Sequence, residues 1–79
     1  MTKLPRWPGK DIISVFKKDG WALDRIEGSH HILAKTNTEL ILVIPVHGNK
    51  SVKVGLLKGL ITDAGLTNEE FLRLCHTNK

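Results

Sequence analysis

The chain has 79 residues, enough for one small domain over residues 1–79 but too few for an additional cofactor-binding domain. Its 41% hydrophobic and 25% charged residues are typical of a folded globular protein and exclude a disordered chain. Twelve Lys and Arg residues against eight Asp and Glu residues give a net charge of +4. This charge favours a polyanionic partner such as nucleic acid, although many small proteins are this basic for solubility alone.

Cysteine content and hydropathy indicate the compartment. The single cysteine, Cys75, excludes an internal disulfide framework and fits a reducing environment. The longest apolar run, residues 40–46, is far shorter than the roughly 20 residues of a membrane-spanning helix, and the N-terminus lacks an apolar signal core. We therefore expect a cytoplasmic protein without membrane contact.

The first expected element is a helix that begins at Pro8-Gly9 and ends at Asp19-Gly20. Apolar residues between these bounds recur at helical spacing, and lysines occupy the other face. Residues 1–7, which precede the helix, are expected to form an N-terminal tail.

Three strands are expected next. Residues 21–26 alternate apolar and polar side chains as a half-buried strand does, and Glu27-Gly28 can form a tight turn. Residues 31–34 form the second strand. The β-branched run at residues 40–44 is the candidate for the central strand. The chain is expected to leave the sheet at Pro45, because proline cannot donate a ladder hydrogen bond.

Two helices complete the expected fold. Helical spacing resumes after residue 53, and Thr67 with Glu70 forms a capping box before a short helix that ends near Cys75. The order of helix, three strands, helix and short helix indicates an α+β fold with a three-stranded antiparallel sheet. Both long helices are expected on one face of the sheet, which leaves the other face open for a ligand.

Histidine at the start of the second strand carries the clearest chemical signal. His30 directly follows Gly28 and Ser29, whose small side chains let a phosphate approach the backbone amides. RNA cleavage without a metal needs one group that removes the proton from the 2′-hydroxyl and one that protonates the leaving oxygen. Imidazole suits both tasks because its ordinary pKa of about 6.5 leaves both protonation states populated.

Less specific interpretations of these histidines stay open. His30 and His31 could be ordinary solvated residues, since side chains alternate along a strand and only one of the two can face a given surface. Zinc binding is less expected still, because adjacent histidines point to opposite faces and no Cys or carboxylate cluster has ligand spacing. No metal site is predicted.

Basic residues after the third strand form a second group. The loop and the next helix would present a positive ridge beside the sheet, and an RNA backbone could bind between this ridge and other basic side chains near the same surface. The candidates are Arg25, Lys35, His47, Lys50, Lys53 and Lys58. Lysines of this kind are also common on any solvated helix. Trp7 and Trp21 are interpreted as packing residues.

Four short segments occur in a characteristic order. They are Gly20-Trp21 after a lysine-rich helix, Gly28-Ser29-His30-His31, Val43-Ile44-Pro45-Val46-His47-Gly48, and Leu57 onward to Ala64-Gly65-Leu66-Thr67. In this order and spacing the chain resembles the HicA family of toxin components, also called YcfA-like proteins. The resemblance runs from about Gly9 to Leu74.

This resemblance implies a fold like that of a double-stranded RNA-binding domain and a ribosome-independent endoribonuclease activity on mRNA. It also implies neutralisation by a HicB-type antitoxin. In the family pattern the histidine directly after Gly-Ser is catalytic, which here is His30, and His31 is left for support or RNA contact. The second acid or base could be His47, His31, a lysine or water; we rank His47 first because it follows the neighbouring strand.

The chain departs from the family pattern in two places. Family members often have Lys-Pro-Gly-Thr-Leu where this chain has Lys53-Val54-Gly55-Leu56-Leu57. The missing hydroxyl removes one possible phosphate contact, although the backbone amides of the helix start remain. Residues 1–7 have no clear counterpart and could be a loose tail or part of an antitoxin contact.

The expected function is that of a toxin in a type II toxin–antitoxin system. It would be a metal-independent endoribonuclease without a cofactor, with mRNA and the antitoxin as partners. One alternative is a non-catalytic RNA-binding module of the double-stranded RNA-binding type. A further alternative is an inert domain whose basic face meets an acidic protein.

Overall fold

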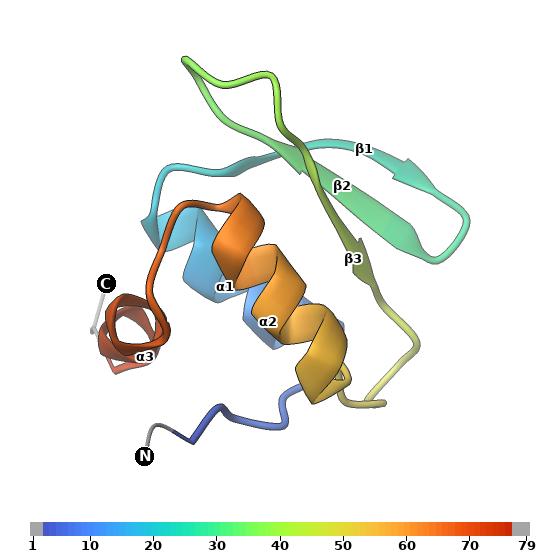
Figure 1. Ribbon diagram of the computed structural model, residues 1–79. Coiled ribbons are helices and arrows are strands. Elements are labelled where there is room, and N and C mark those ends of the chain that lie inside the picture. Colours follow the sequence, from blue (N-terminus) through green and yellow to red (C-terminus); the bar gives the residue numbers. More distant parts are fainter. Residues whose placement is uncertain (1–2, 77–79) are drawn as a thin grey trace.

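The computed structural model describes residues 3–76, and its elements follow the predicted order (Figure 1). They are α1 (Gly9–Lys18), β1 (Ala22–Glu27), β2 (His30–Ala34), β3 (Leu42–Pro45), α2 (Val54–Asp63) and α3 (Asn68–Cys75). The strands form one antiparallel sheet in the order β1-β2-β3, which confirms the predicted α+β fold. Within residues 3–76, no helix has the length and hydrophobicity to span a bilayer.

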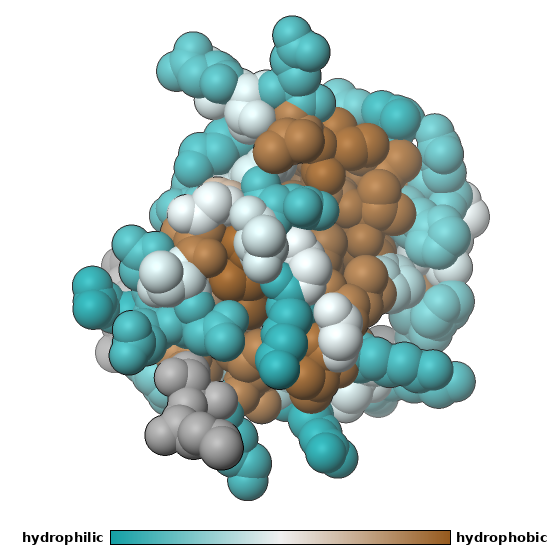
Figure 2. Space-filling model, viewed as in Figure 1, coloured by the Kyte–Doolittle hydropathy of each residue, from teal (hydrophilic) through white to brown (hydrophobic). Residues whose placement is uncertain are grey.

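The central strand is β2, so the prediction that residues 40–44 form it is wrong. Each strand pairs with its predecessor in the chain, and this order leaves β3 at an edge. The edge position also explains why Pro45 is the last residue of β3 instead of lying outside the sheet, because an edge strand tolerates a missing N–H group. Figure 2 shows hydrophobic residues gathered along β3 and the segment before it, where Ile41 and Val43 are exposed.

The helices α1 and α2 cover one face of the sheet and pack against β3 (Figure 1). Leu33 of β2 and Leu42 and Ile44 of β3 face them and are completely buried. The short helix α3 closes the core, since Phe71 packs on Phe16 of α1 with ring centroids 5.3 Å apart. Burial of a phenyl side chain of this kind contributes about 1.5–3 kcal/mol.

The predicted capping box is present at the start of α3. The Glu70 amide donates to Thr67 Oγ1 at 3.0 Å, and the Thr67 amide donates to the Glu70 carboxylate at 2.8 Å. These bonds satisfy two amides that have no partner inside the helix, and they therefore fix where α3 begins.

Strand β1 is exposed at all six positions, so the prediction that residues 21–26 form a half-buried strand is wrong. Only Trp21, which precedes β1, is buried. The reason is that the helices pack against β3, and β1 lies at the opposite edge. A bulge at Asp24 also breaks the alternation. Leu23 pairs with Leu33 of β2, whereas Arg25 pairs with Ile32, so the bulge moves Arg25 to the sheet face opposite to Leu23.

The segment before α1 packs on the domain over its described residues, 3–7, and is not a loose tail there. Leu4 belongs to the core and is only 8% exposed. The Ser51 hydroxyl donates to the Arg6 carbonyl and the Val52 amide donates to the Trp7 carbonyl, both at 3.0 Å. Residues 1 and 2 of the expected tail lie outside the described residues.

Candidate active site

A turn of two residues, Gly28 and Ser29, joins β1 to β2 and places His30 at the first position of β2. Gly28 has φ +60°, a left-handed conformation that glycine adopts without strain. A positive φ at the first central residue is the pattern of a type II′ hairpin turn. Glycine is therefore favoured here, and the turn fixes which face of the sheet His30 occupies.

The sheet register separates the two histidines. His30 pairs with Glu27 of β1 and Pro45 of β3, and its side chain is exposed. Because side chains alternate, His30 shares a face with Ile32, which lies outside the core cluster under the helices. His30 is thus on the face that α1 and α2 leave open.

His31 lies on the helix-covered side of β2. It pairs with buried Ile44 and is itself half-buried. Its Nδ1 atom is buried and has no hydrogen-bond partner among the described residues. This position suits packing better than contact with a long substrate.

Cationic side chains follow β3 at the end of the sheet where His30 lies. The Val46 amide donates to the Ser29 carbonyl at 2.7 Å, so the chain leaves the sheet beside the Gly28-Ser29 turn. The next residues surround a space of about 300 Å³, here called the His47 hollow. It is lined by Pro45, His47, Lys50, Ser51, Val52, Lys53 and Leu56. No carboxylate lines this hollow, and no ion pair seen within residues 3–76 includes Lys50 or Lys53.

A family model described as the HicA toxin of bacterial toxin–antitoxin systems matches residues 9–66. The chain belongs to the HicA toxin family. It is therefore a toxin component whose system includes an antitoxin partner. No curated protein gives a significant match to the chain. The family match covers α1, the whole sheet and α2, and so includes His30 and the His47 hollow.

The remaining predicted RNA-binding residues of this HicA protein are not gathered at His30. Arg25 is on the open face, but it donates to Glu27 at 2.7 Å and to Asp24 at 2.6 Å. These hydrogen bonds, that to Glu27 first, raise the pKa of Arg25 and offset its charge. Lys35 follows the opposite end of β2 and lies 3.2 Å from Asp19. Lys58 is exposed on α2 and lines none of the hollows described here.

One cation beside the candidate site, Arg6, was not predicted from the sequence. Arg6 lines a space of about 320 Å³ with Ser51, Val52, Lys53 and Val54, here called the Arg6 hollow. Three residues, Ser51 to Lys53, line both this hollow and the His47 hollow. The apolar residues Leu4 and Trp7 on either side of Arg6 were the signal that this segment packs on the domain.

The start of α2 adds no side-chain cap. Lys53 is the N-cap residue, and no side-chain hydrogen bond satisfies the first amides of α2. The hydroxyl that this chain lacks relative to the family pattern is therefore not replaced by another side chain. The free amides at the start of α2 still favour anions.

Proposed function

We propose that this HicA toxin is a metal-independent endoribonuclease that cleaves mRNA and uses His30 as a general acid or base. The observation that carries the proposal is the position of His30. It is exposed at the first residue of β2, on the sheet face that the helices leave open, at the end where the cationic loop begins. A buried His30, or one under α1 and α2, would be incompatible with this chemistry.

The reaction assigns separate tasks to the residues near His30. One imidazole removes the proton from a ribose 2′-hydroxyl, whose oxygen attacks the adjacent phosphorus, and an acid protonates the leaving 5′-oxygen. His47 is the proposed second group, because it lies two residues after Pro45, the cross-strand partner of His30. Lys50 and Lys53 line the same hollow as His47 and would offset the charge that builds on the phosphate oxygens.

The proposed antitoxin is of the HicB type. An antitoxin that blocks cleavage has to cover His30 or the His47 hollow, and an exposed apolar surface lies on the same side of the sheet. Val43 of β3 lies on the open face and is 38% exposed, whereas its cross-strand partner Ile32 is buried, with 4% exposed. A protein partner can bury this surface together with His30.

Expression in cells tests the proposal. Induction of the parent protein should stop growth and deplete messages, whereas His30→Ala at equal abundance should do neither. Co-expression of a HicB-type antitoxin should restore growth. Growth arrest by His30→Ala equal to that of the parent would show that His30 is not the catalyst.

Purified protein tests the chemistry. Parent protein should cleave a long single-stranded RNA and leave the same RNA intact when its 2′-hydroxyls are methylated, because the nucleophile is then blocked. Cleavage should persist in EDTA. Loss of cleavage in EDTA that Mg²⁺ or Zn²⁺ reverses contradicts the metal-independent mechanism. Binding of duplex RNA without any cleavage would favour the non-catalytic RNA-binding module instead.

A further inference from the structure

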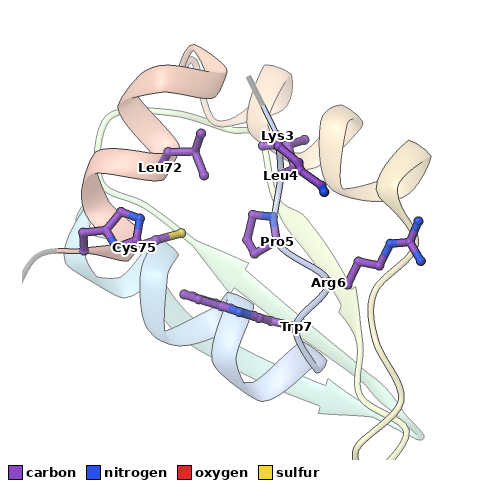
Figure 3. A pocket seen from close by; sticks show the side chains of 8 residues that line it. Lys3, Leu4, Pro5, Arg6, Trp7, Leu72 and Cys75 are labelled. Carbon is purple, nitrogen blue, oxygen red and sulfur yellow. The ribbon is translucent and has the colours of Figure 1, made fainter. Parts of the chain in front are cut away.

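A cavity of about 620 Å³ lies between the segment before α1 and the end of α3 (Figure 3). We call it the terminal cavity, and it is lined by residues 3–7 together with Leu72, Cys75 and His76. All of these residues lie outside the part of the chain, 9–66, that matches the HicA family model. The cavity is therefore a feature of this chain and does not follow from its family membership.

The chemistry of the terminal cavity suits a nucleotide. Lys3, Arg6 and His76 line the cavity, and no carboxylate of residues 3–76 does. The Arg6 side chain lies at the rim and extends away from Trp7 and Cys75 (Figure 3). The half-buried indole of Trp7 lies below Pro5, and its ring extends toward Cys75 (Figure 3). Aromatic rings beside basic side chains are the combination with which proteins bind single-stranded nucleic acid, because bases stack while cations contact phosphates.

Shared lining residues place the terminal cavity in a row with two hollows that lead toward His30. Arg6 lines both the terminal cavity and the Arg6 hollow, and Lys53 lines both the Arg6 hollow and the His47 hollow. The His47 hollow in turn reaches Pro45, the cross-strand partner of His30. In the part of the chain that the structure describes, no carboxylate lines any of the three spaces.

The segment that forms one wall of the cavity is fixed to the rest of the site. The hydrogen bonds from Ser51 and Val52 hold the backbone of Arg6 and Trp7 beside the loop that carries Lys53. Leu4 is buried in the core and anchors the other end of the same segment. The backbone of Arg6 is therefore held at a defined place, so little backbone entropy is lost on binding.

We propose that the terminal cavity is a second RNA subsite, which binds a nucleotide of single-stranded RNA several positions away from the phosphodiester at His30. A strand that occupies it would run from His30 past Lys50 and Lys53 to Arg6, with a base against Trp7. The subsite rests on the proposed RNase function for its biological role, but its RNA binding can be measured without cleavage. Trp7, interpreted from the sequence as a packing residue only, gains a second role in this proposal.

Affinity for RNA gives the first test. The full chain with His30→Ala binds a labelled single-stranded RNA of about ten nucleotides, a length typical of single-strand binding sites. In this background Arg6→Gln should weaken binding about fivefold. Lys17→Gln is the matched control, because Lys17 is exposed on α1, lines none of the three spaces and should change binding less than twofold. Trp7→Leu should also weaken binding, with its melting temperature measured alongside.

Alkylation of Cys75 gives the second test, since it is the only cysteine in the chain and lines the terminal cavity. Burial raises the pKa of the Cys75 thiol, so the reaction is followed in mildly alkaline buffer, where more thiolate is present. The same RNA should slow alkylation of the His30→Ala protein several-fold. The Arg6→Gln change should remove most of this protection.

The outcomes separate the subsite from the proposed function. Loss of RNA affinity in Arg6→Gln with protection of Cys75 supports the subsite, even if the parent protein cleaves no RNA and the nuclease proposal fails. Equal RNA affinity of Arg6→Gln and Lys17→Gln, or alkylation at the same rate with and without RNA, overturns the subsite even if His30 proves catalytic. If Arg6→Gln keeps its RNA affinity but binds the purified antitoxin more weakly, the subsite is also overturned, and the cavity is assigned to a protein contact.

Discussion

His30 and His31 are adjacent in the sequence and lie on opposite faces of the sheet. His30 is exposed on the open face, whereas His31 is half-buried against Ile44 on the face covered by the helices. The two residues therefore form a natural pair for substitution, because one can be changed without altering the surface on which the other lies.

The polar ring nitrogen of His31 should not stabilise the fold. His31→Leu removes a buried Nδ1 that has no partner among the described residues and adds apolar contact beside Ile44. We expect the free energy of unfolding to rise by about 1 kcal/mol. Urea denaturation measures this change. A fall of similar size would show that the His31 ring makes a stabilising polar contact.

Gly9 should tolerate no side chain. A Cβ atom at this position would collide with the carbonyl oxygen of Pro45, where the start of α1 meets the end of β3. Gly9→Ala should lower the free energy of unfolding by about 1–3 kcal/mol, because both colliding groups are held by backbone.

Gly59 of α2 provides the matched control for Gly9. A Cβ atom there meets nothing within 4 Å. Gly59→Ala should raise the free energy of unfolding by about 0.5–1 kcal/mol, since alanine restricts the unfolded chain and favours helix. Thermal or urea denaturation compares the two variants, and equal effects of the same sign would contradict the packing of α1 on β3.

The cations predicted to bind RNA should differ in their effect on RNA binding. Lys53 is in no ion pair seen within residues 3–76, whereas Arg25 is bonded to Asp24 and Glu27. In the His30→Ala background, Lys53→Gln should reduce the slope of log affinity against log salt by about 0.7 for single-stranded RNA. Arg25→Gln should change it by much less. A larger reduction of the slope in Arg25→Gln than in Lys53→Gln would mean that RNA displaces Asp24 and Glu27 from Arg25.

Much of the site followed from local sequence patterns, and the rest depended on contacts between distant segments. Alternation along β2 placed His30 and His31 on opposite faces, and the Thr67 and Glu70 pair fixed the start of α3, because both patterns act within a few residues. The central position of β2 could not be derived this way, because hydrophobicity alone does not order strands within a sheet. The ion pair of Arg25 with Asp24 was not predicted, because neighbouring residues of a regular strand point to opposite faces and the sequence does not mark the bulge between Leu23 and Arg25.

The packed segment before α1 is a further case. Its place in the structure depends on Ser51 and Val52, more than forty positions along the chain, which form hydrogen bonds with residues 6 and 7. A stretch of seven residues is too short to give a periodic signal by itself. For this reason Arg6 was expected in a tail, although it lies beside Lys53 at the edge of the candidate site.

The rate at which purified His30→Ala cleaves a long single-stranded RNA tests the central claim most directly, with parent protein and His31→Leu assayed beside it. Because His30 is exposed and lies outside the core, the free energy of unfolding of His30→Ala should be within about 0.5 kcal/mol of that of the parent. We expect cleavage by His30→Ala to fall at least about a hundredfold, with RNA binding retained and with His31→Leu close to the parent. Cleavage by folded His30→Ala at the parent rate would contradict the assignment of His30 as the catalytic residue.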